Sequence, residues 1–143
     1  MTKKTKIPTW FWLLAGGALL WNLGGCASYL IQVSLTPEDL ATMEEGVRGL
    51  YENLPAWVNA AYAIAVWAGA AGSLLLLLRR QLALPVLVVS LVGIVIQSSY
   101  NLFMSEAAAV YGTVGLMMPI MLVLIGLALI WFARYAKQQG WLR

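Results

Sequence analysis

The sequence predicts an all-α membrane protein: one domain, 1–143, that forms an antiparallel, up-down-up-down four-helix transmembrane bundle with a short outer amphipathic helical segment. Three observations lead to this prediction. The 143 residues are 62 % hydrophobic and only 10 % charged, whereas soluble domains average about 45–50 % apolar and about 25 % charged residues. A soluble protein of this size has too little interior to bury so much apolar surface. Four long apolar segments without Asp, Glu, Lys or Arg hold most of the excess, and each is long enough to cross a bilayer.

The first predicted span covers about 8–33, and the outer interfacial segment 36–55 follows it. Thr36 and Pro37 are typical of a helix start, with a threonine N-cap, proline in the first turn and the acid Asp39 three residues after the cap. Apolar residues then recur every three or four positions, which predicts an amphipathic helix that glycines and Pro55 interrupt. Two interpretations stay open: a helix that lies on the outer leaflet, or a lid over an outward-facing pocket.

The other predicted spans cover about 56–78, 82–102 and 110–132. The short connections after the second and third spans favour antiparallel neighbours. Each span carries small or polar residues at alternating spacings of three and four, the pattern of a left-handed helix seam. In the second span, the small ridge Ala61, Ala65, Gly69 and Ser73 is a candidate surface for a homodimer. Pro119 lies inside the fourth span and is expected to kink it.

Charge predicts the orientation of the bundle. Eight of the nine basic residues lie before the first span, between the second and third, or after the fourth: Lys3, Lys4, Lys6, Arg79, Arg80, Arg134, Lys137 and Arg143. Arg48 and all six acids lie on the other side. Lys and Arg mark the cytoplasmic side in short loops, so we expect a bacterial inner-membrane protein with both termini in the cytoplasm. The lipid bilayer explains these charges as anchors, and no nucleic-acid partner is expected.

Aromatic residues are expected to form belts at the two interfaces, because amphipathic rings favour headgroup depth. The predicted inner belt contains Trp10, Phe11, Trp12, Trp131, Phe132, Tyr135 and Trp141, and the outer belt contains Tyr51, Trp57, Tyr100, Phe103 and Tyr111.

Several classes of function are excluded by composition. Histidine is absent and Cys26 is the one cysteine, so no zinc or haem site of the usual ligands can be built and no Ser–His or Cys–His pair can form. No glycine-rich phosphate-binding motif occurs. We therefore expect no cofactor and no enzymatic activity. The predicted spans also lack the ionisable residues that ion-coupled carriers place in the membrane.

Polar residues of the spans are the candidate functional site, since most of them lie in the predicted outer half, Asn22 lies near the middle, and the inner half is almost wholly aliphatic. We expect an uncharged cavity that opens outward and suits a small neutral polar solute, because amides bind hydroxyl groups and aromatic faces stack on ligands. The alternative is that these side chains only join helices, at roughly 0.6 kcal/mol for an average hydrogen bond. The candidate residues are Asn22, Tyr29, Gln32, Asn59, Tyr62, Gln97 and Asn101, with Trp21 and Trp67 near mid-membrane.

Six stretches carry a resemblance to a known group of proteins: Leu20-Trp21-Asn22-Leu23-x-Gly25 with Tyr29, Leu54-Pro55-Ala56-Trp57, Ala65-Val66-Trp67-x-Gly69-x-x-Gly72, the leucine run ending at Arg79-Arg80, Ser90-Leu91 with Gln97, and Gly140-Trp141-Leu142. With these residues the chain resembles a family of small four-helix bacterial inner-membrane proteins of unknown function that are often labelled "sugar transporter". The resemblance implies a four-helix membrane fold and a sugar-like solute.

Two functions follow as expectations. The first is binding or facilitated passage of a small neutral polar solute without ion coupling, by a homodimer if four helices alone enclose no path. The second is an accessory or scaffolding subunit of a larger membrane complex, which docks a partner through its outer segment.

Overall fold

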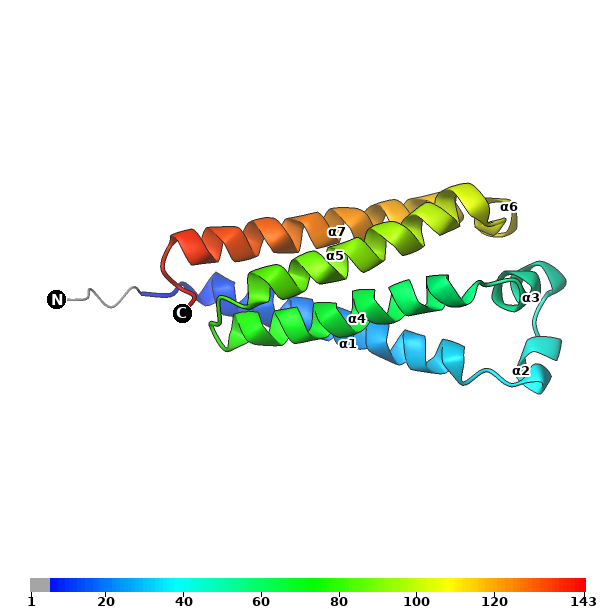
Figure 1. The fold of residues 1–143 in the computed structure, drawn as a ribbon, viewed down its shortest axis with the longest axis horizontal. Helices are drawn as coiled ribbons and strands as arrows, with labels where there is room; N and C mark the ends of the chain where they lie inside the picture. Colours follow the sequence, from blue (N-terminus) through cyan, green and yellow to red (C-terminus); the bar gives the residue numbers. More distant parts are fainter. Residues whose placement is uncertain (1–5) are drawn as a thin grey trace.

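The computed structural model describes residues 6–143, and within this range the chain forms helices and no strand. The long helices are α1 (Thr9–Val33), α4 (Ala56–Leu77), α5 (Ala83–Ser99) and α7 (Thr113–Gln138) (Figure 1). A π-helical turn, η1 (Tyr100–Met104), continues α5, and three short helices complete the fold: α2 (Pro37–Ala41), α3 (Glu45–Glu52) and α6 (Ala107–Tyr111). α1, α4, α7 and the continuous stretch Ala83–Met104 are each long and apolar enough to cross a membrane.

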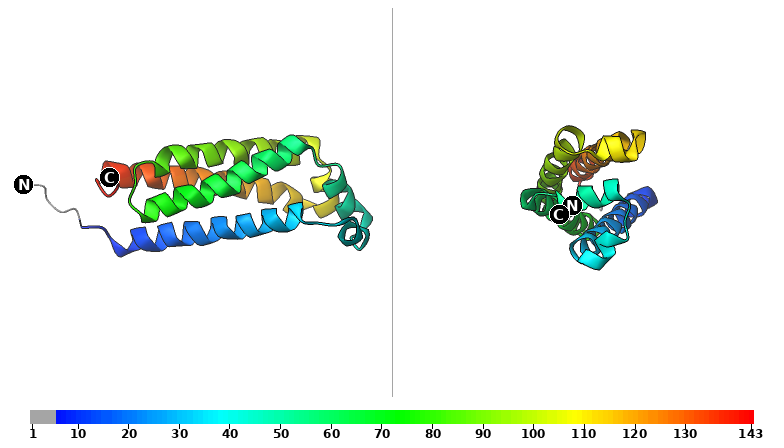
Figure 2. Two further views of the ribbon diagram at one scale, coloured as in Figure 1. Left: turned by 60° about the horizontal axis from the view of Figure 1, so that its bottom comes forward. Right: turned by 90° about the vertical axis from the view of Figure 1, so that its right-hand side faces the viewer.

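The long helices pack in chain order, α1 on α4, α4 on α5 and α5 on α7. α1 begins at the end of the molecule where α7 finishes, and we call this the terminal end (Figure 1). The opposite end, which carries α2, α3 and α6, is the loop end (Figures 1 and 2). The described basic residues of the predicted cytoplasmic side lie at the terminal end, while Arg48 and the acids lie at the loop end. Lys3 and Lys4 lie outside the described residues.

A close backbone contact joins α4 and α5 at Gly93. A Cβ atom at this position would lie 2.7 Å from the Ala61 carbonyl oxygen and 2.8 Å from the Ala65 nitrogen, so only glycine permits this approach. Ala61 and Ala65 are each 4 % exposed, and Ser73 is fully buried. The ridge that the sequence offers as a dimer surface is therefore used inside one chain, because α4 packs against both α1 and α5.

The terminal end is closed by a cluster of aromatic and aliphatic side chains. Phe11, Phe132 and Trp141 are 0 %, 4 % and 6 % exposed, and the Phe11 ring centroid lies 5.5 Å from that of Phe132 and 5.7 Å from that of Trp141. The prediction that these three rings belong to an interfacial belt is therefore wrong, because they are buried inside the protein. Trp10 and Trp131, at 44 % and 67 % exposed, stay on the surface.

Trp141 is buried because the chain turns back after α7. Gly140 has a φ of 76°, and the Trp141 N–H donates to the Ala136 carbonyl at 3.0 Å, which is the Schellman pattern of a helix end. Arg79 ends α4 in the same left-handed region, with a φ of 58°. Its Nε donates to the Trp141 carbonyl at 2.8 Å, and its own carbonyl accepts from the Arg143 N–H at 2.6 Å. The α4–α5 turn and the C-terminal tail are thus joined.

Two boundaries at the loop end differ from the predictions. The segment 36–55 forms two helices, because the chain breaks after α2 rather than at the glycines; the Thr36 start is confirmed, with a capping box to Asp39. The fourth span starts at Thr113 instead of about 110 and continues to Gln138. Gly112, with a φ of 65°, separates α6 from α7.

Candidate functional site

A cavity of about 330 Å³ lies at the loop end, and we call it the loop-end cavity. α1, α3, α4, α5, η1, α6 and α7 all contribute to its wall. Apolar side chains such as Leu54, Val58 and Met118 form part of the wall. The polar side chains of the wall are Gln32, Tyr51, Tyr62, Gln97, Tyr100, Asn101, Ser105 and Tyr111.

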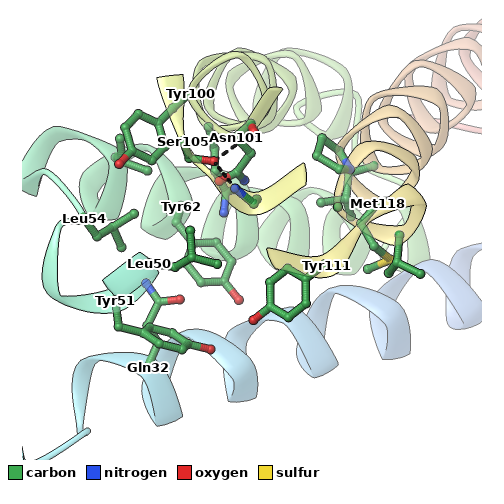
Figure 3. Close-up of a pocket in the computed structure, with 17 residues that line it drawn as sticks. Gln32, Leu50, Tyr51, Leu54, Tyr62, Tyr100, Asn101, Ser105, Tyr111 and Met118 are labelled. Carbon is green, nitrogen blue, oxygen red and sulfur yellow. Dashed lines mark hydrogen bonds between the residues drawn. The ribbon is translucent and has the colours of Figure 1, made fainter. Parts of the chain in front are cut away.

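Three tyrosines from different helices meet in this cavity. Figure 3 shows the hydroxyl ends of Tyr51, Tyr62 and Tyr111, from α3, α4 and α6, pointing toward a shared space. The Tyr62 ring also packs edge-on against the Tyr29 ring of α1, with 5.4 Å between the two ring centroids. Burial, followed by the nearby Tyr51 phenol, raises the pKa of Tyr111 above its ordinary value. The phenol of Tyr111 is therefore neutral at physiological pH and can both donate and accept hydrogen bonds.

Two amide side chains line the same cavity without a protein partner. Within residues 6–143, the side chains of Gln97 and Asn101 make no hydrogen bond, although the Asn101 backbone carbonyl accepts from Ser105 at 2.9 Å. Both residues are half-buried. Asn101 lies in the π-helical turn η1, a rare local geometry that is frequent at functional sites. A free amide offers two donors and an acceptor to a ligand.

A second cavity of about 470 Å³, the central cavity, lies deeper between the four long helices. Its wall includes Trp21 and Asn22 of α1 and Ser90 of α5, while α7 contributes only apolar residues and one glycine: Met118, Leu122, Ile125, Gly126 and Leu129. Tyr62, Gln97, Met118 and Leu122 line both cavities. The two spaces are therefore adjacent, and one wall of side chains runs from the loop end to the middle of the bundle.

Asn22 joins helices in this structure. Its side-chain nitrogen donates to the Ala18 carbonyl at 2.8 Å and to the Ser73 hydroxyl of α4 at 3.2 Å. Gly69 makes room for this contact, since a Cβ atom there would overlap the Asn22 side chain. Ser90 likewise joins two helices, because its hydroxyl donates to the Ala65 carbonyl of α4 at 2.6 Å. For both residues the helix-joining alternative explains their hydrogen bonds better than ligand binding.

Gln32 and Asn59 form a second link between α1 and α4, at the loop end. The Gln32 Nε2 donates to the Asn59 Oδ1 at 2.8 Å, and Gln32 also faces the loop-end cavity. Neither cavity is lined by Asn59 or by Tyr29. Trp67 is 47 % exposed and lines neither cavity. Val66 lines the central cavity. Trp67 is the next residue of α4, and a helix turns by about 100° per residue, so the Trp67 ring faces away from that cavity.

Sequence reasoning assigned Tyr51, Tyr100 and Tyr111 to an interfacial belt, and the structure places them in the wall of the loop-end cavity. Ser105 was missed as well. Tyr100 and Tyr111 lie at the ends of predicted spans and Tyr51 lies in the outer segment, and no local pattern distinguishes a tyrosine that faces a cavity from one that faces headgroups. The distinction arises from how α3 and α6 fold over the ends of the long helices.

The site is uncharged. Among the described residues, none that lines either cavity carries a formal charge, and no group of three His, Cys, Asp or Glu residues within 6–143 could hold a metal ion. Cys26 is buried and free, and its thiol donates to the Val66 carbonyl at 3.4 Å. The arrangement is suited to binding a neutral molecule by hydrogen bonds and aromatic contact. In comparisons with protein-family models, curated proteins and solved structures, none matches this chain.

Proposed function

We propose that this protein binds a small neutral polar solute, sugar-like in its hydroxyl groups, in the loop-end cavity and facilitates its passage without ion coupling. The proposal places the four long helices in a bacterial inner membrane as an antiparallel bundle, with both termini in the cytoplasm and the loop end outside. The distribution of charge supports this orientation, because the described basic residues except Arg48 lie at the terminal end. A homodimer is part of the proposal, through a face other than the buried ridge of α4.

The observation that carries the proposal is the pair of free amides, Gln97 and Asn101, beside three converging phenols. Within residues 6–143 no buried side-chain nitrogen or oxygen lacks a hydrogen-bond partner, so the amide atoms of Gln97 and Asn101 are accessible from the cavity, where water or a ligand can bond them. Hydroxyl groups of a neutral solute complement amides and phenols, and tyrosine rings contact its C–H faces. α3 forms part of the wall through Leu50 and Tyr51, which favours a covering role for this segment.

Passage requires a second conformation in this proposal. The cluster around Phe11, Phe132 and Trp141 closes the terminal end, so the structure corresponds to a state that is open at the loop end. Solute movement to the other side needs this cluster to separate. Neither cavity wall, as the structure describes it, contains Asp, Glu, Lys or Arg, and this is consistent with facilitated rather than ion-coupled movement.

The experiment is an uptake assay in proteoliposomes with glycerol, erythritol and glucose, followed by light scattering. Gln97→Leu removes a side chain that makes no hydrogen bond in the protein, so we expect normal folding and a loss of uptake of about tenfold, the size of one good hydrogen bond. Ser99→Ala is the matched control, because Ser99 is exposed on the same helix and bonds only the Val95 carbonyl. Equal uptake by wild-type and protein-free vesicles for all three solutes contradicts the proposal.

One observation favours the alternative of an accessory subunit. A groove on the loop end, with a volume of about 910 Å³, is lined by Glu44, Glu45, Glu52 and Glu106 with Arg48 as the one basic residue. A partner with a basic surface fits this groove by charge. Crosslinkers attached near Glu44 or Glu52 would then trap a defined partner, and Gln97→Leu would leave that complex intact.

A further inference from the structure

We propose that the central cavity holds the hydrocarbon chain of a neutral amphiphile, whose polar head binds in the loop-end cavity, and that this ligand enters from the bilayer between α1 and α7. The inference rests on the proposed function and refines it, since it names the ligand as a molecule with a hydroxyl-bearing head and an apolar chain.

The first argument is the continuity of the two cavities. Tyr62 and Gln97 line both of them, as do Met118 and Leu122 of α7. A head held by the free amide of Gln97 therefore has the wall of the central cavity directly beside it. A solute that fills only the loop-end cavity leaves about 470 Å³ of adjoining space unused.

The second argument is the change of chemistry with depth. The hydrogen-bond donors of Asn22 and Ser90 are already used within the protein. The α7 wall of the central cavity offers apolar side chains, Leu122, Ile125 and Leu129 among them. The other polar side chains of the wall include Ser28, Tyr62 and Gln97, which lie toward the loop end, so the part of the cavity nearer the terminal end is mainly apolar and holds water poorly. A hydrocarbon chain matches this wall, whereas a free sugar would leave most of its hydroxyl groups without partners.

The third argument is the open seam between α1 and α7. These two helices meet at the terminal end through Phe11 and Phe132, but the packing that joins α1 to α4 and α5 to α7 does not extend between them. Gly24 of α1 lines the central cavity and is exposed, and a Cβ atom there would meet no other atom within 4 Å. Leu20 and Trp21 beside it are 72 % and 45 % exposed. In a membrane this opening faces lipid chains.

The test uses a monoacylglycerol with a photoreactive diazirine in its acyl chain, added to phosphatidylcholine vesicles that contain the full chain. After illumination, mass spectrometry maps the labelled residues. We expect label on Leu122 and Ile125, which line the central cavity, in excess over Leu124 and Leu127, which are 60 % and 49 % exposed on the outer face of α7.

Two glycine variants provide the matched comparison. Gly24→Leu places a side chain in the seam and is expected to lower labelling of Leu122 and Ile125 by about tenfold, because it occupies the path of the chain. Gly17→Leu is the control: Gly17 lies two turns earlier on the same face of α1, is exposed and lines neither cavity, and a Cβ atom added there would meet nothing within 4 Å. It should leave the labelling unchanged.

The outcomes separate this inference from the proposed function. Label confined to Leu124 and Leu127, with glycerol or glucose uptake intact, overturns the inference and leaves the proposed function standing. If Leu122 is labelled and Gln97→Leu does not reduce that labelling, the assignment of the polar head to the loop-end cavity is overturned. Label on Leu122 that falls in both Gly24→Leu and Gln97→Leu, and not in Gly17→Leu, supports the full proposal.

Discussion

Replacing Gly93 by alanine tests the close backbone contact that holds α4 against α5. The added Cβ atom would lie 2.7 Å from the Ala61 oxygen and 2.8 Å from the Ala65 nitrogen, where ordinary contact starts at 3.4 Å. Both atoms belong to the α4 backbone, so no rotamer change relieves the overlap, and the helices must separate locally by about 0.6–0.7 Å. Overpacking of this kind costs about 1–3 kcal/mol, and alanine regains about 1 kcal/mol by helix propensity, so we expect a net loss of up to about 2 kcal/mol.

The free energy of unfolding is measured by titration with sodium dodecyl sulfate in mixed micelles and followed by circular dichroism. Gly17→Ala is the control, because the same substitution in α1 meets nothing within 4 Å. It should raise stability by about 1 kcal/mol through helix propensity, so Gly93→Ala is expected to be about 1–3 kcal/mol less stable than this control. A Gly93→Ala variant as stable as Gly17→Ala would refute the close α4–α5 approach, and with it the geometry that places Ser90 and Gln97 in the cavity walls.

Three further predictions concern single contacts. A double-mutant cycle of Asn22→Ala and Ser73→Ala in the same unfolding assay should give a coupling energy of about 0.6 kcal/mol, and no more than about 2 kcal/mol. A coupling energy of zero would contradict the role of the Asn22–Ser73 hydrogen bond in joining α1 to α4. Gly140→Ala should lower the free energy of unfolding by about 1–2 kcal/mol, because a Cβ atom strains a residue in the left-handed region. The tail should loosen, so a water-soluble quencher should quench Trp141 fluorescence more strongly. Unchanged quenching would contradict the turn at Gly140. The raised pKa of Tyr111 favours the neutral phenol in the folded state, so its contribution to stability is complete below the ordinary value of 10.0 and is lost as the pH rises through the raised value. Ultraviolet titration should show that Tyr111→Phe loses one late-ionising tyrosine relative to the wild type.

The helical fold and the four long apolar helices could be predicted from the sequence, because uninterrupted apolar length is a property of each segment alone. The predicted ends of the first two spans fall within one residue of α1 and α4. The start of α7 at Thr113 could not be read in the same way, since Gly112 is one of many glycines and its positive φ depends on how α6 packs. The π-helical turn at 100–104 has no compositional signal either.

The candidate site was predicted in part, and the reason differs from residue to residue. Gln97 and Asn101 line the loop-end cavity, and they could be proposed from the sequence because local periodicity sets their depth along the span and their helix face. Whether an amide is free or paired depends on the partner helix, and Asn22 is paired because Ser73 lies opposite it. Trp141 was expected at an interface, yet the tail that carries it folds back on Arg79, a contact between residues 62 positions apart.

The attachment of α1 to α7 at one end has a mechanical consequence. From Phe11 to Gln32, α1 extends about 30 Å beyond the point where the two helices are fastened, at about 1.5 Å per residue. Because Gln32 bonds Asn59 at the far end, α1 tilts together with α4, and a change of about 5° at the base displaces the loop-end tip of this pair relative to α7 by roughly 3 Å. Small rearrangements among Phe11, Phe132 and Trp141 would therefore be magnified at the opposite rim. Leverage of this kind lets a few side chains set the width of the whole aperture.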